Sequence, residues 1–223
     1  MIDNPRKSVV PIMALDNEGN PSDFLGSAFF IDNPKILVTA NHVLIEDVEK
    51  YAIIVMPDYD SPFYASVIKT DEKLDLAHLQ VEGYFPENPF QLMDDQNEIA
   101  LNDVVVCNDY GLSMKIGDKV TISPSVRMGN VSRILDNEQR FIYSGQTVLE
   151  LSFPIFRGAS GAPIFKNTDR RVVGVAQANV DYHKIAAQIA RTFDARGEPV
   201  EEIEYMLPSG LALHVQHLKD FLG

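Results

Sequence analysis

The chain has 223 residues, of which 45% are hydrophobic and 23% are charged. This is the composition of an ordinary globular protein, and it excludes a disordered chain, a collagen and a coiled coil. There are 19 Lys and Arg residues against 32 Asp and Glu residues, and the resulting net charge of −13 argues against binding to nucleic acid or to an anionic membrane.

Cysteine content and apolar run length limit where the protein can work. Cys107 is the only cysteine, so no disulfide can form within the chain. The apolar runs are too short to cross a bilayer, and the first residues contain no continuous apolar stretch of signal-peptide length. We therefore expect a cytoplasmic protein, unless the chain is a piece of a longer one.

Short strands dominate the predicted secondary structure. Most apolar segments are brief, are rich in Val, Ile, Phe and Tyr, and are separated by Gly, Pro, Asn and Asp, which predicts a sandwich or a barrel. The segment 82–89 contains a glycine and two prolines and indicates a linker. We expect one strand-rich half at residues 8–84 and another at residues 85–223.

A first helical pattern lies in the second half. Ile185, Ile189 and Phe193 recur at intervals of four residues, which predicts a helix over 183–193. This helix would belong to an insertion at 181–208, whose remaining residues are mostly polar and loop-like.

The C-terminal tail carries a second helical pattern. Residues 214–222 have Val215, Leu218 and Leu222 on one face, so we expect the chain to end in an amphipathic helix.

The first candidate for chemistry is a histidine. Residues 36–44 read Ile-Leu-Val-Thr-Ala-Asn-His-Val-Leu, so His42 follows the end of a predicted strand. By itself, a histidine among apolar residues is also typical of a structural residue whose ring is satisfied within the core.

The second candidate is an acid within an apolar segment. Asp75 is flanked by leucines in Leu74-Asp75-Leu76-Ala77-His78-Leu79, which we interpret as a strand. Burial of a carboxylate is costly unless it is paired and hydrogen-bonded, and a histidine ring N–H is a natural partner. The alternative is a place on the polar face of an edge strand.

The third candidate is a serine between glycines. Residues 156–163 read Phe-Arg-Gly-Ala-Ser-Gly-Ala-Pro and predict a tight turn before a strand. Such a turn exposes the Ser160 hydroxyl and lets a substrate approach the backbone closely. The amides of Gly158 and Ser160 would point at one spot, where they could bind an oxyanion. Taken alone, the pattern also fits a plain surface turn.

The order of the three segments, with His42 first, Asp75 second and Ser160 third, carries a resemblance to a known family. In this order the sequence resembles the chymotrypsin-like serine peptidases, above all the bacterial trypsin-like peptidases of the high-temperature-requirement type. The matching segments are residues 26–31, 38–42, 74–77, 158–163 and 173–175. The resemblance covers roughly residues 8–222. It implies an all-β fold with two six-stranded antiparallel β-barrels and a C-terminal helix.

The same resemblance implies a serine endopeptidase that acts on polypeptides without a metal or a cofactor. Ser160 would be the nucleophile, His42 the general base and Asp75 the group that orients the imidazole. Gly158 and Ser160 would form the oxyanion hole through their amides. His42 and Asp75 would lie on the first barrel and Ser160 on the second, so the site would sit between them.

Alignment to the family also indicates a substrate pocket. Its predicted lining is Ile155, Gln177, Ala178 and Asn179. Trypsin has an acid six residues before its serine, where this chain has Pro154, so we expect a small or medium uncharged side chain before the cut. Asp181 is the nearby acid that would change this expectation.

The position before the serine departs from the digestive enzymes. There an aspartate receives the newly cleaved N-terminus and completes the active form, whereas this chain has Ala159. The resemblance therefore implies no activation of the trypsinogen kind.

Two alternatives to a constitutively active enzyme remain. One is a catalytically silent peptide-binding or scaffold module with the protease fold. The other is a protease held latent until a regulatory partner or a flanking domain acts on the insertion 181–208. Long segments beside active sites often control access to them.

Overall fold

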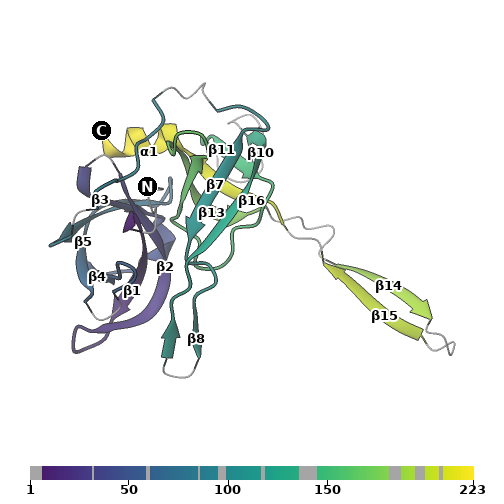
Figure 1. The fold of residues 1–223 in the computed structure, drawn as a ribbon, viewed down its shortest axis with the longest axis horizontal. Coiled ribbons are helices and arrows are strands. Elements are labelled where there is room, and N and C mark those ends of the chain that lie inside the picture. The colour runs from purple at the N-terminus through teal and green to yellow at the C-terminus, as the bar shows by residue number, and fades with distance from the viewer. Residues whose placement is uncertain are drawn as a thin grey trace.

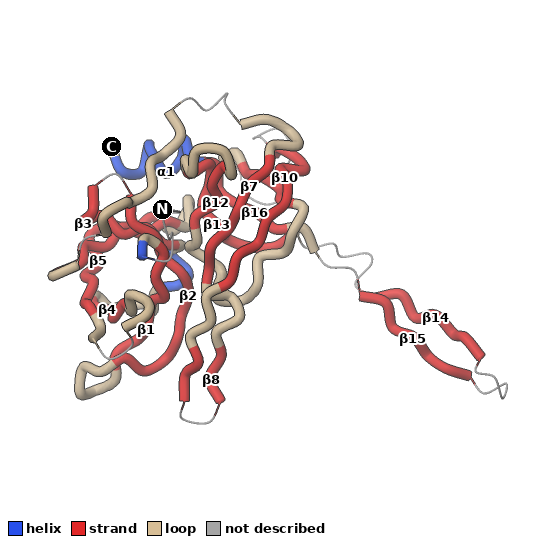
Figure 2. The backbone as a smooth tube through the Cα atoms, in the orientation of Figure 1, coloured by secondary structure: helices blue, strands red, loops and turns tan. Residues whose placement is uncertain are grey.

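The architecture comes from a computed structural model. It describes residues 7–31, 33–58, 61–84, 86–94, 99–116, 119–135, 145–180, 187–193, 199–205 and 208–223. Strands make up both lobes of the molecule (Figure 2).

The first barrel is a closed antiparallel sheet with the strand order β1-β2-β3-β6-β5-β4, which pairing between β1 and β4 completes. Its interior is an apolar cluster that includes Ile12, Phe30 and Leu37. The strands are β1 (Val9–Leu15), β2 (Pro21–Ile31), β3 (Asn33–Thr39), β4 (Lys50–Ile53), β5 (Phe63–Asp71) and β6 (Leu76–Glu82).

The second barrel is closed in the order β10-β11-β16-β13-β12-β7, with β7 and β10 paired. A second apolar cluster runs from the first barrel through the seam into this one. The strands are β7 (Val104–Asp109), β10 (Ser125–Leu135), β11 (Val148–Leu151), β12 (Pro163–Lys166), β13 (Val172–Asn179) and β16 (Gly210–His214). The predicted pair of six-stranded barrels is therefore confirmed.

The C-terminal helix α1 (Val215–Leu222) packs on both barrels (Figure 1). Val215, Leu218 and Phe221 are its buried residues, so Phe221 takes the place that the sequence pattern assigned to Leu222. The Lys69 ammonium of β5 lies 4.6 Å from the centroid of the Phe221 ring and donates a hydrogen bond to the Phe221 carbonyl. The helix thereby joins the two lobes.

The helix predicted for 183–193 is wrong over 187–193, and residues 181–186 lie outside the described part. Strand β14 (Ala187–Phe193) pairs with β15 (Pro199–Tyr205) over seven residue pairs and forms a separate arm (Figure 1). An interval of four residues keeps one face in a strand as well as in a helix, so the pattern was ambiguous. Pairing with β15, whose residues were expected to form a loop, favours the strand.

A smaller hairpin, β8 (Met114–Ile116) with β9 (Lys119–Thr121), follows β7.

Candidate active site

His42 lies in a short turn that leaves the first barrel. After β3 the chain makes a 3-10 turn, Asn41–Val43, in which the Leu44 amide donates to the Asn41 carbonyl over 3.0 Å. Val43 is buried and anchors this turn, whereas the side chain of His42 is 49% exposed. The buried Val43 side chain therefore fixes the turn, while the imidazole of His42 remains accessible from the surface of the protein.

Asp75 contacts His42 through both carboxylate oxygens. The His42 backbone amide donates to Oδ1 over 2.9 Å, and the ring atom Nδ1 lies 2.7 Å from Oδ2. Asp75 is in the turn before β6, not inside the strand as predicted, and its φ is +53°. Aspartate tolerates the left-handed region better than most residues do. With this backbone conformation, the carboxylate of Asp75 is directed toward His42.

The serine turn meets the first barrel closely. Gly158 has a φ of +89° and Gly161 a φ of +82°, so both glycines adopt left-handed backbone. A Cβ atom at Gly161 would lie 2.2 Å from Thr39 Oγ1 and 2.3 Å from the Ser27 carbonyl oxygen. The Ser27 amide donates to the Ser160 carbonyl over 3.0 Å. Contacts with Ser27 and with the strand that leads to His42 thus position Ser160 at the seam.

The Ser160 hydroxyl has a partner on its own barrel. Its Oγ donates to the Gln177 carbonyl over 3.1 Å, and within the described residues no hydrogen bond joins it to His42. The Gln177 side chain reaches the other barrel, where Nε2 donates to the Leu74 carbonyl over 2.7 Å. Gln177 therefore links the serine to the segment that carries Asp75, a role that sequence reasoning missed.

Two amides are available beside Ser160. Neither the Gly158 nor the Ser160 backbone N–H donates a hydrogen bond to another described residue, whereas the intervening Ala159 amide donates to the Phe156 carbonyl over 2.9 Å. A free amide on the nucleophile itself and another two residues before it are suited to a developing oxyanion.

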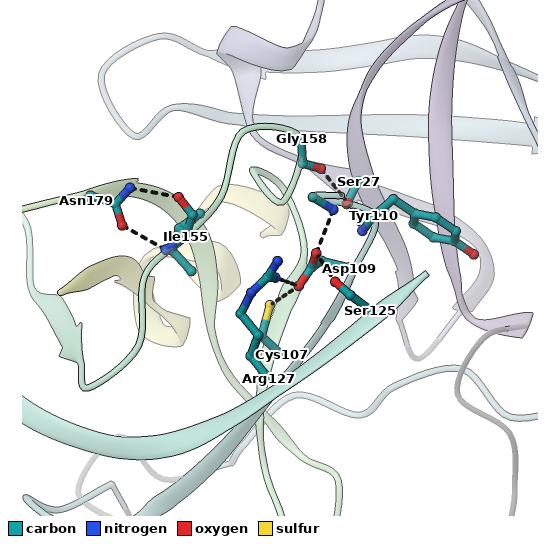
Figure 3. A network of polar contacts seen from close by, with 10 residues as sticks. Ser27, Cys107, Asp109, Tyr110, Ser125, Arg127, Ile155, Gly158 and Asn179 are labelled. Atoms are coloured by element: carbon teal, nitrogen blue, oxygen red, sulfur yellow. Dashed lines mark hydrogen bonds and ion pairs between the residues drawn. The ribbon is translucent and has the colours of Figure 1, made fainter. Parts of the chain in front are cut away.

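Two of the four predicted pocket residues face each other. Asn179 Oδ1 accepts from the Ile155 amide and Nδ2 donates to the Ile155 carbonyl, each over 2.7 Å (Figure 3). Gly210 lies against them, since a Cβ atom there would be 2.8 Å from Ile155 Cγ1. Ala178 continues β13 beside Asn179, while the Gln177 side chain points to the first barrel instead. Asp181 lies outside the described residues.

Other features of the described residues limit the chemistry of the site. No group of three or more His, Cys, Asp or Glu side chains there is arranged to hold a metal ion. Cys107 is fully buried, and burial raises the pKa of its thiol well above the ordinary value, so it is not a competing nucleophile. No helix in the described part is long and apolar enough to span a membrane.

An open pocket of about 660 Å³ adjoins His42 on the first barrel. Its lining is acidic and includes Glu46, Asp47, Glu49 and Glu72. Negative charge at this place favours cationic groups.

Comparison with known proteins gives one family and two curated relatives. A family model for the trypsin-like peptidase domain matches residues 26–175. Two relatives are each named a probable periplasmic serine endoprotease DegP-like. The one from Bartonella henselae is 31% identical over 155 residues, which are 69% of this chain and 27% of that protein. The one from Pseudomonas putida is 30% identical over 154 residues, which are 68% of this chain and 28% of that protein.

The chain thus spans little more than a quarter of the length of these two relatives. Both are named as periplasmic, which does not support the cytoplasmic location expected from the sequence.

Solved structures share the fold. The active form of the Rv3671c protease from M. tuberculosis superposes with a TM-score of 0.65 at 19% identity, over 98% of this chain and 80% of that one. The HtrA-type protease AlgW with a decapeptide gives 0.63 at 17% identity, over 97% and 64%. The MamO protease domain from Magnetospirillum magneticum gives 0.62 at 15% identity, over the whole of both chains.

Proposed function

Since the chain belongs to the trypsin-like peptidase family, as its motifs predicted, we propose that it is a serine endopeptidase with His42, Asp75 and Ser160 as its triad. The observation that carries the proposal is the 2.7 Å contact between His42 Nδ1 and Asp75 Oδ2, beside a serine turn with two free amides. A polypeptide is the proposed substrate.

The His42–Asp75 geometry supports a general base. With Oδ2 accepting from Nδ1–H, the neutral imidazole keeps its lone pair on Nε2. The bond from the His42 amide to Oδ1 prevents the carboxylate from rotating away. Nε2 would then take the Ser160 proton as Oγ attacks the scissile carbonyl, and would return it to the leaving amine. Water would hydrolyse the resulting acyl-enzyme by the same route.

The oxyanion of the tetrahedral intermediate would be bound by the Gly158 and Ser160 amides. One such donor contributes roughly 2.7–4 kcal/mol to transition-state stabilisation. One amide belongs to the nucleophile and the other lies two residues before it, so the charge would develop within reach of two fixed dipoles.

The bond from Ser160 Oγ to the Gln177 carbonyl supports a resting state. Attack requires the hydroxyl to leave Gln177 and to turn toward His42. We propose that substrate or a partner drives this rotation, so that the enzyme is latent until it is engaged.

The same bond also favours the second candidate function, a peptide-binding module without turnover. In such a module Ser160 would keep Gln177 as its permanent partner, and His42 and Asp75 would serve only to hold together the turns after β3 and before β6.

Covalent labelling distinguishes the two functions. A fluorophosphonate should label the wild-type serine and leave Ser160→Ala unlabelled and without peptidase activity, with an unchanged circular dichroism spectrum. Ser132→Ala removes an exposed hydroxyl on β10 and should change neither property. Absence of labelling and of turnover in the wild type, with and without peptide ligands, would favour the binding module.

The pocket geometry supports selection of a small side chain before the cut. The side-chain amide of Asn179 is bonded to the Ile155 backbone, and Gly210 lies so close to the Ile155 side chain that a Cβ atom there would be 2.8 Å from Cγ1. No acid stands at Pro154, where trypsin has one. We therefore propose an uncharged residue of small or medium size at this position of the substrate.

The insertion 181–208 is the proposed regulatory element. It begins two residues after Asn179, where β13 ends, and its β14–β15 arm extends away from both barrels (Figure 1). Replacing 181–208 with a short Gly/Ser turn should change peptide turnover while fluorophosphonate still labels Ser160. Unchanged turnover and unchanged response to partners would rule out this role.

A further inference from the structure

A buried charged pair lies beneath the serine turn, at the end of β7 and the start of β10. Asp109 faces Ser125 and Arg127 faces Cys107 in the antiparallel register, so the four side chains share one face of the two strands. Asp109 is 1% exposed, and the side chain of Arg127 is 10% exposed. Figure 3 shows the pair between the strands and the turn that carries Gly158.

All acceptor capacity of the Asp109 carboxylate is in use. Oδ1 accepts from the Gly111 amide over 2.6 Å and from Ser125 Oγ over 2.8 Å, while Oδ2 pairs with Arg127 Nη1 and with the Cys107 thiol. A carboxylate held in this way is fixed in position, because loss of any one of these bonds would leave a buried negative charge with fewer donors.

The guanidinium of Arg127 holds the first residue of the serine turn. Its centre lies 4.4 Å from the centroid of the Phe156 ring. Nη2 is buried and has no hydrogen-bond partner among the described residues, and a Cβ atom at Gly111 would lie 3.2 Å from it. A cation stacked on an aromatic face is bound more strongly when it is shielded from water.

The segment after Asp109 supports the other end of the turn. A Cβ atom at Gly111 would be 3.0 Å from Ala159 Cβ, so the Gly111 backbone packs directly against this residue. Ser27 Oγ accepts from the Tyr110 amide over 3.0 Å and donates to the Gly158 carbonyl over 2.8 Å. The position of Gly158 is thus tied to the chain segment that Asp109 fixes.

We propose that Arg127 and Asp109 are positioning residues that hold the turn 156–159 in the geometry needed for oxyanion binding. Ala159 has no charge, so the turn cannot be held by an ion pair from the residue before the serine. The Arg127–Asp109 pair restrains the turn instead. Arg127 acts through the Phe156 ring, and Asp109 acts through Gly111. This role rests on the proposed peptidase function, because it acts through the Gly158 amide.

Two conservative variants test the contact. Arg127→Lys keeps a cation for Asp109 but loses the planar face, and Phe156→Leu keeps an apolar side chain but loses the ring. Each should lower kcat about ten- to a hundredfold with KM within about twofold, since complete loss of one oxyanion donor costs about 10²–10³-fold. A peptide aldehyde, which forms a tetrahedral adduct with the serine, should lose affinity in parallel.

The double variant and a control separate positioning from stability. Each change removes the same contact between Arg127 and Phe156. The double variant, Arg127→Lys with Phe156→Leu, should therefore lower kcat no further than the worse single variant. Arg133→Lys makes the same exchange at an exposed side chain of β10 and keeps a cation beside the buried Glu150 carboxylate of β11, so it should leave kcat and KM unchanged.

Four results would overturn the inference. Variants that melt earlier but retain wild-type kcat per folded molecule would show a structural role only. Losses that multiply in the double variant, or that fall on KM alone, would do the same. An unlabelled and inactive wild type would instead overturn the proposed function, and this role with it.

Discussion

Acid should destabilise the protein through His214, which ends β16 and caps helix α1. Its ring is buried, and Nδ1 accepts a hydrogen bond from the Gln216 amide over 3.2 Å. Burial, followed by the positive charges of His217 and Lys219, lowers the pKa of His214 from 6.5 to about 4. A proton on Nδ1 would remove the acceptor and place a charge in the core.

The sign and size of the effect follow from these two values. Between pH 6.5 and about 4 the unfolded chain binds a proton that the folded chain refuses, so stability falls as the pH falls. The contribution is complete above pH 6.5 and is lost below about 4. At about 1.4 kcal/mol per pH unit, this difference corresponds to about 3 kcal/mol of unfolding free energy. His217, whose pKa burial also lowers and whose Nε2 accepts from the Thr147 amide, adds in the same direction.

Urea unfolding followed by far-UV circular dichroism measures the effect, since the chain contains no tryptophan. His214→Asn is the matched variant, because asparagine caps a helix well and does not titrate. The wild type should lose about 2–3 kcal/mol more than this variant between about pH 7.5 and 4.5. The comparison cancels the carboxylates, and the effect of the His217 charge on His214 is counted as part of the His214 contribution. Parallel curves for the two proteins would refute the assignment of the acid sensitivity to His214.

Three further predictions concern the site and the seam. Asp75→Asn should lower kcat by about 10⁴ with little change in KM, because the amide favours the wrong imidazole tautomer; a change in KM alone would contradict this role. Asn179→Ala should increase cleavage after larger uncharged side chains in a peptide library, and an unchanged profile would show that its amide does not limit the pocket. Gly161→Ala should cost about 2–6 kcal/mol of stability, since the new Cβ atom meets the first barrel at a positive φ. Gly19→Ala, also at positive φ but with no atom within 4 Å, should cost only about 1–2 kcal/mol, and equal losses would refute the steric argument.

Much of the fold could be predicted from local patterns. Short β-branched and aromatic segments between turn residues indicate strands wherever they occur, and the C-terminal stripe indicates a helix, because each depends on neighbours only a few residues away. The arm at 187–205 shows the limit of such patterns. An interval of four residues suits both a helix and a strand, and pairing with β15 decided between them.

The sequence by itself also determined which residues are candidates for chemistry, through three motifs in a specific order. Only the tertiary structure decided their partners. His42 contacts Asp75 across 33 residues of chain, Ser160 contacts Gln177 across 17, and Arg127 contacts Asp109 across 18. The strength of a hydrogen bond or an ion pair changes when the donor–acceptor distance shifts by a few tenths of an ångström or when the direction changes. Barrel closure and strand register set both quantities, and neither is encoded in the residues next to the bond.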